Sequence, residues 1–141
     1  MYRKIVLALD GSEGSKRAIP HAVEQAKASE GEIVVVHVDE RMIAKGDMPS
    51  VNPNEELIQD EIRGQVKEIE DAGVKVSLEI IPLVLGGPGG SINEIAEKAD
   101  ADLIVVGTRG RSSLTGLVLG GVAHRLLHVA RRPVLAVPSP K

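Results

Sequence analysis

Residues 103–121 read LIVVGTRGRSSLTGLVLGG, which predicts a buried strand, a glycine-rich loop and the start of a helix. The opening apolar run has no polar alternation, as is typical of a strand buried on both faces of a parallel sheet. The loop carries Arg109 and Arg111. Unpaired backbone N–H groups and the dipole at a helix N-terminus favour an anion there. The stretch therefore indicates a phosphate-binding loop, with the rest of the chain building the sheet behind it.

Further apolar runs lie on both sides of this stretch. The run at 33–38 is rich in β-branched residues, which favour strands. Val76, Leu78 and Ile80 alternate with polar residues, which indicates a half-exposed strand at a sheet edge. We therefore expect five strands, over residues 5–9, 33–38, 74–85, 103–106 and 134–137.

Four helices are expected between these strands. Ser12 or Asp10 can cap the first helix, with Ser15 as a second candidate. Pro20 lies inside this helical pattern and should remove a hydrogen bond or kink the helix. The other three helices are predicted to begin at residue 55, at residue 91 or 93, and at about residue 122. Residues 39–54 are predicted to be a mobile loop with at most one helical turn at 41–44, and residues 86–90 a flexible turn.

Strands that alternate with helices predict a parallel sheet with helices on both faces, joined by right-handed crossovers. In such sheets, ligands bind at the carboxyl ends of the strands, where the strand order reverses. Here these ends carry glycine-rich or acidic loops at 10–12, 86–90 and 107–111, and His37 to Asp39 at a fourth. We expect residues 1–141 to form one domain, because the chain has no internal repeat or linker.

Composition excludes several classes of function. The chain has no cysteine, so disulfides, thiolate zinc sites and cysteine nucleophiles are excluded. Tyr2 is the only aromatic residue and the net charge is −3, which argue against nucleic-acid and anionic-membrane partners. The apolar run at 5–9 is too short for a signal peptide or a membrane span, so we expect a cytoplasmic protein.

Catalytic and metal-binding motifs are sparse. His124 and His128 lie four residues apart on one predicted helix face, but without a third ligand a solvated or interfacial pair is favoured over a metal site. His37 has no evident serine partner. The glycines at 86–90 lack the Lys-Ser or Lys-Thr of a Walker loop. No residue is predicted to act as a general base.

The glycine spacing of the opening stretch is similar to that of a known family. Gly107, Gly110 and Gly120 follow the pattern of Gly, two residues, Gly, nine residues, Gly. The segments at 4–12, 36–38, 101–107 and 133–137 also match the family at their expected places. Together they make the whole chain resemble the universal stress protein family, in its nucleotide-binding form.

The resemblance implies a three-layer, doubly wound, Rossmann-like α/β fold with strand order 3-2-1-4-5. It also implies binding of ATP, ADP or AMP, with Asp10 contacting the ribose or a Mg²⁺ ion and the backbone of Val38 contacting adenine. Capping and core packing remain the alternative roles of Asp10 and Val38. The implied nucleotide-binding residues are Ala8, Leu9, Asp10, Ser12, Val38, Val106, Gly107, Arg109, Gly110, Gly120, Gly121 and Val122.

We expect a stress-response regulator with at most slow, incidental ATP hydrolysis, which forms a homodimer through the apolar strand Val134–Val137. Its downstream protein partner is unknown. The chain departs from the family at Gly121, where nucleotide-binding members have Ser or Thr. One lost hydroxyl hydrogen bond costs about 0.5–1.5 kcal/mol, so binding should persist with less preference for a triphosphate. The alternative is a dimeric interaction protein of the same fold that binds no nucleotide.

Overall fold

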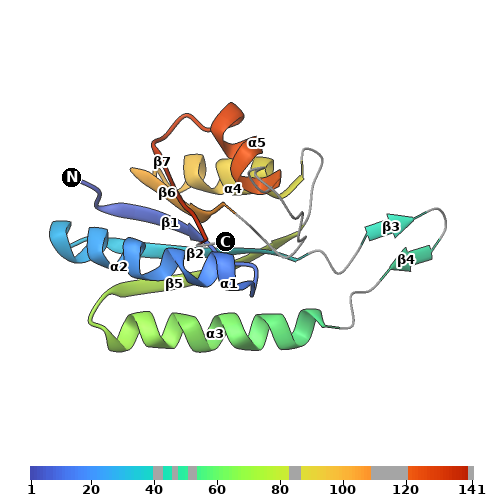
Figure 1. Ribbon diagram of the computed structural model, residues 1–141, viewed down its shortest axis with the longest axis horizontal. Coiled ribbons are helices and arrows are strands. Elements are labelled where there is room, and N and C mark those ends of the chain that lie inside the picture. Colours follow the sequence, from blue (N-terminus) through green and yellow to red (C-terminus); the bar gives the residue numbers. More distant parts are fainter. Residues whose placement is uncertain (40–42, 46–47, 51–53, 83–86, 109–120, 140–141) are drawn as a thin grey trace.

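The central feature of the computed structural model is a sheet of five parallel strands (Figure 1). The structure describes residues 1–39, 43–45, 48–50, 54–82, 87–108 and 121–139, with 43–45 and 48–50 described by their backbone. The strand order is β5-β2-β1-β6-β7, which confirms the predicted order 3-2-1-4-5. The strands are β1 (Lys4–Ala8), β2 (Glu32–Asp39), β5 (Lys75–Pro82), β6 (Leu103–Gly107) and β7 (Val134–Val137).

Helices cover both faces of this sheet and create two separate cores (Figure 1). Side chains alternate along β1, so that Ile5 and Leu7 face one core whereas Val6 and Ala8 face the other. This arrangement confirms the predicted three-layer architecture. The first core is covered by α1 (Glu13–Lys16), α2 (Ala18–Ser29) and α3 (Glu55–Asp71), and the second by α4 (Gly87–Lys98) and α5 (Gly121–Val129).

The first predicted helix is divided in two at Arg17. Ser12 is the N-cap of α1, and its side chain accepts a hydrogen bond from the Ser15 N–H. Pro20 is the third residue of α2. It has no N–H to donate to the Lys16 carbonyl, as a continuous helix would require. Pro20 was predicted to remove a hydrogen bond or kink the helix, and the helix is in fact interrupted at Arg17, one turn before the proline.

Two predicted loops prove to contain regular structure. Within 39–54, β3 (Ile43–Lys45) and β4 (Met48–Ser50) form an antiparallel ribbon, so the prediction of at most one helical turn at 41–44 is wrong for its described residues, Ile43 and Ala44, which lie in a strand. Two residues separate these strands, which is the commonest length of a hairpin connection. A connection of this length favours two antiparallel strands over a helical turn.

The predicted turn at 86–90 is also wrong for its described residues, because α4 already begins at Gly87 rather than at Ser91 or Asn93. Pro88 is tolerated in the first helical turn, where its missing N–H would be unpaired anyway. A Cβ atom added to Gly89 would lie 2.8 Å from Cβ of Arg125 on α5. The glycine therefore serves the close packing of two helices rather than a turn.

β1 and β6 are joined at their first residues by Asp102. One carboxylate oxygen, Oδ2, accepts hydrogen bonds from the backbone N–H groups of Arg3 at 3.0 Å and Lys4 at 2.9 Å. The Asp102 N–H in turn donates to the Lys4 carbonyl at 2.7 Å. These three bonds fix the register of two strands that lie far apart in the sequence.

We expect Asp102→Ala to lower the free energy of unfolding by about 1–2 kcal/mol, because two charge-assisted hydrogen bonds are lost at an exposed position. Urea denaturation measures this change. The control is Asp71→Ala, which removes an exposed ion pair of α3 with Lys67 and should change stability by less than about 0.5 kcal/mol. Equal losses in the two variants would contradict the role of Asp102.

At the same end of the sheet, Glu32 lies between two lysines of neighbouring strands. Its carboxylate oxygens are 3.2 Å from Nζ of Lys75 and 3.3 Å from Nζ of Lys4. The hydrogen bond from Lys75, and then that from Lys4, lower the pKa of Glu32 below its ordinary value of 4.5. Ionised Glu32 therefore stabilises the fold above pH 4.5, and this contribution is lost as the pH falls from 4.5 through the lower folded-state pKa.

We accordingly expect Glu32→Gln to lose less stability than the wild type as the pH falls below 4.5. Denaturant unfolding at a series of acidic pH values measures this slope. Lys75→Met, which removes the larger cause of the lowered pKa, should give an intermediate slope. Identical slopes in the wild type and Glu32→Gln would show that Glu32 does not contribute to acid stability.

Candidate functional site

The turn that follows β1 is held by a compact set of hydrogen bonds. Oδ1 of Asp10 accepts from the Ser12 N–H at 2.8 Å, and the Asp10 N–H donates to Oγ of Ser15 at 3.2 Å. Gly11 has a φ of +83°, a conformation that favours glycine. Because Ser12 caps α1, the carboxylate of Asp10 shapes the turn rather than capping the helix.

The end of β6 packs directly against the backbone of α1. A Cβ atom added to Gly107 would lie 2.4 Å from the carbonyl oxygen of Gly14 and 3.1 Å from the Ser15 nitrogen. No larger residue fits without moving the backbone. Gly107 thus brings the end of β6 next to the turn that holds Asp10, on an adjacent strand.

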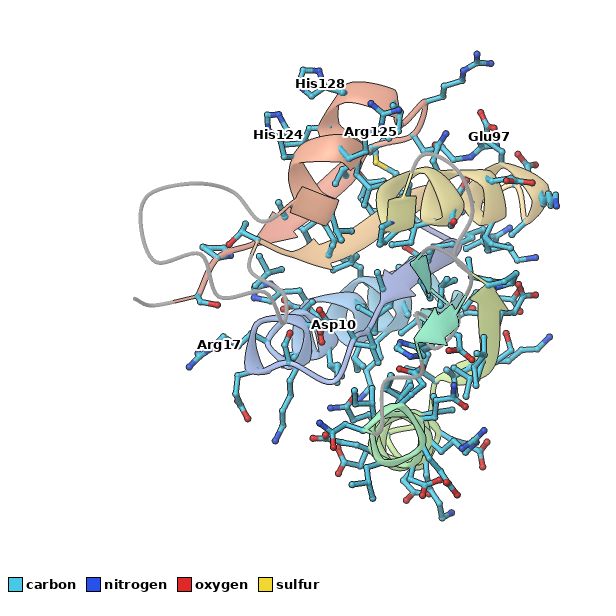
Figure 2. All side chains as sticks on the ribbon, turned by 90° about the vertical axis from the view of Figure 1, so that its right-hand side faces the viewer. Asp10, Arg17, Glu97, His124, Arg125 and His128 are labelled. Atoms are coloured by element: carbon cyan, nitrogen blue, oxygen red, sulfur yellow. The ribbon has the colours of Figure 1, made fainter. Side chains whose placement is uncertain are left out.

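The described part of the predicted site lies along one edge of the sheet. Asp10 is seen there in Figure 2, at the end of β1 near α1. The buried residues Val38 and Val106 are the last but one in the flanking strands β2 and β6, and they belong to the core under α4 and α5. Gly121 and Val122 begin α5. The structure therefore brings together Ala8, Leu9, Asp10, Ser12, Val38, Val106 and Gly107 at neighbouring strand ends, whereas Arg109, Gly110 and Gly120 lie outside the described residues.

A buried polar cluster beneath this edge was not predicted from the sequence. His37 is 2% exposed and Glu55 is 1% exposed. The His37 ring places Nδ1 2.9 Å from the Leu9 carbonyl oxygen and Nε2 2.6 Å from Oε1 of Glu55. The amide of Gln59 donates to the same Glu55 oxygen at 3.0 Å and to Oδ2 of Asp39 at 3.3 Å. Glutamate at a helix start is ordinarily solvated, so the sequence carried no signal for this pair.

The described residues contain no group of three or more side chains able to hold a metal ion. His124 and His128 are exposed on α5, with their ring centroids 4.7 Å apart in an edge-to-face arrangement. Figure 2 shows them on the side of α5 away from Arg125, which faces α4. Over the same described part of the chain, no helix has the length and apolar character needed to cross a membrane.

Comparison with known proteins gives a consistent result. The model of the universal stress protein family matches residues 1–138. Universal stress protein MJ0531 of Methanocaldococcus jannaschii is 36% identical over 150 residues, which cover 100% of this chain and 85% of the relative.

Two solved structures are similar over nearly the full length of both chains. Protein MJ0577 superposes with a TM-score of 0.75 at 28% identity, covering 100% of this chain and 99% of that one. A universal stress protein in complex with cAMP superposes with a TM-score of 0.69 at 25% identity, covering 96% of each. Strand order, sequence and superposition therefore agree that the chain belongs to the universal stress protein family.

Proposed function

We propose that this chain binds an adenine nucleotide at the carboxyl edge of its sheet and acts as a stress-response regulator rather than an enzyme. The observation that carries this proposal is the junction of Gly107 with the backbone of α1. It sets the start of the glycine-rich loop beside the Asp10 turn, at the strand ends where ligands bind in such folds. The spacing of Gly107, Gly110 and Gly120 and the cAMP complex of a relative support the same ligand class.

Each part of the edge has a role in this proposal. The backbone of Val38 binds adenine, and the Asp10 carboxylate binds the ribose or a Mg²⁺ ion. Mg²⁺ is commonly held by one or two carboxylates together with phosphate oxygens. In this proposal, Asp10 supplies the carboxylate and the nucleotide supplies the phosphate oxygens. The phosphates lie on the loop at 107–121 and the N-terminal end of α5, where backbone N–H groups favour anions. Arg109 supplies positive charge.

Nucleotide binding should raise the thermal stability of the wild type, because a ligand at 100 times its Kd adds about 2.7 kcal/mol. We would titrate ATP, ADP, AMP and cAMP and follow unfolding by circular dichroism. Gly110→Val should abolish the shift in melting temperature, since its side chain would block the approach of the loop to phosphate. Gly64→Ala is the matched control, because a Cβ atom at Gly64 meets nothing within 4 Å.

Mass spectrometry of whatever copurifies with the protein identifies the nucleotide independently. A wild type that shows no shift with any nucleotide well above micromolar concentration would reject this function. An unchanged shift in Gly110→Val would instead show that the loop is misassigned.

A second candidate function is a dimeric interaction protein that binds no nucleotide. Gly121 favours it, because the hydroxyl expected to bind a terminal phosphate is missing there. The backbone N–H of Gly121 remains, and the missing hydrogen bond accounts for about 0.5–1.5 kcal/mol, or roughly one decade in affinity at most. We therefore place nucleotide binding first, with a reduced preference for ATP over AMP.

We also propose that two copies pair through β7, which ends the five-stranded sheet. The carbonyl of Pro133 accepts a hydrogen bond from the N–H of Ile104 in β6, and that of Val137 accepts one from Thr108, just after β6. Since N–H and C=O groups alternate sides along a strand, those of Val134 and Ala136 point away from β6. An apolar strand whose outer edge pairs with no other strand of the described sheet is a template for a second copy.

Light scattering at tens of micromolar should accordingly give the mass of a dimer. Ala136→Pro should give a monomer, because it removes an outward N–H and leaves the bonds to β6 in place. Thermal unfolding of this variant checks that the fold persists. A monomeric wild type, or a dimeric and folded Ala136→Pro variant, would contradict pairing through β7.

A further inference from the structure

The first turns of α3 support the Asp10 turn at two points. Ile58 lies beneath Gly11, where an added Cβ atom would be 3.0 Å from Cγ2 of Ile58. Glu55 reaches the Leu9 carbonyl through the ring of His37. Leu9 and Gly11 are the two neighbours of Asp10 in the chain. The position of Asp10 is therefore set from both sides by one helix that lies under the sheet edge.

The hydrogen bonds of His37 define where its protons lie. A carbonyl oxygen only accepts, so Nδ1 carries a proton and donates it to the Leu9 carbonyl. The 2.6 Å contact between Nε2 and Oε1 of Glu55 then requires one proton between these two atoms. On either atom, this proton leaves the pair neutral as a whole. Neutrality explains how both side chains tolerate nearly complete burial.

The Glu55 carboxylate is held at one oxygen only. Oε1 meets His37 and accepts from the Gln59 amide, whereas Oε2 is buried and has no hydrogen-bond partner within the described structure. A buried polar atom without a partner is costly and therefore calls for an explanation. The Gln59 amide helps to hold Oε1 in place, and the bonds of Nε2 to Oε1 and of Nδ1 to the Leu9 carbonyl together orient the His37 ring.

We propose that His37 and Glu55 are a positioning pair for nucleotide binding, a proposal that rests on the function given above. The proton between them orients the His37 ring, the ring holds the Leu9 carbonyl, and this contact sets Asp10 for the ribose or its Mg²⁺ ion. Neither side chain touches the nucleotide. Glu55 belongs to α3, so this helix determines affinity at a site to which it contributes no ligand group.

Two substitutions at Glu55 distinguish the effect of its hydrogen bond to His37 from the effect of its side-chain volume. Glu55→Gln keeps a donor for Nε2, because its amide can replace the shared proton. Glu55→Leu fills a similar volume and leaves Nε2 without a partner. The matched control is Glu61→Leu, which makes the same chemical change at an exposed position of α3.

Affinity for ATP is measured by calorimetry at a temperature where circular dichroism shows every variant folded. We expect Glu55→Leu to bind roughly tenfold more weakly, as one lost positioning bond implies, while Glu55→Gln and Glu61→Leu stay within about threefold of the wild type. If both Glu55 variants are folded but only Glu55→Gln keeps the wild-type affinity, the effect comes from positioning and not from general stability. A folded Glu55→Leu variant with wild-type affinity overturns the proposal.

Two further measurements test the proposal if Glu55→Leu does not fold or if the wild type binds no nucleotide. Nitrogen-15 NMR of the wild-type His37 ring should show a proton on Nδ1 and a hydrogen-bonded Nε2. An unprotonated Nδ1 overturns the proposal, even if Glu55→Leu does not fold. If the wild type binds no nucleotide, the proposed function fails, and amide exchange at Asp10 and Ser12 then tests positioning alone. Faster exchange in Glu55→Leu than in Glu55→Gln supports it, and equal rates overturn it.

Discussion

Strand β1 pairs with β2 along one edge and with β6 along the other, and the rest of the structure is arranged around this double pairing. It places the reversal of strand order at the carboxyl end of β1, where the chain turns at Asp10. It also divides the side chains of β1 between two cores, each covered by its own helices. Since no other described strand joins the two halves of the sheet, the site and both cores depend on β1.

Close backbone contacts, more than large side chains, bring the parts of the site together. Gly107 lies against Gly14, and Gly89 lets α4 approach Arg125 of α5. The core has almost no aromatic residues, so it is filled by aliphatic side chains of similar size. At Gly107 and Gly89 an added Cβ atom would come within 2.8 Å of a neighbouring atom, so these two contacts require glycine. Substitutions at these junctions therefore act on backbone position directly.

The sequence predicted the sheet well because each strand is a continuous or alternating apolar run. The residues of the proposed ligand edge were chosen from their places at strand ends and from family spacing, and they stay a prediction, since residues 109–120 are not among those that the structure describes. The errors of the sequence prediction arose where tertiary contacts decide local structure. Gly87 starts a helix because Gly89 packs on α5, and Glu55 is buried because His37 meets it. Neither partner is a neighbour in the sequence, so local patterns carried no sign of them.

The bonds from Asp102 to Lys4 close a separation of 98 residues, and this has a consequence for folding kinetics. β1, β2 and β5 are joined by shorter crossovers, and their pairing needs only residues up to 82. Docking β6 onto β1 must instead overcome the entropy of closing this loop of 98 residues. We therefore expect a half-sheet to assemble first and β6 with β7 to join it in the slow step. The edge that we propose as the ligand site, which needs both sides of β1, would then be among the last features to form.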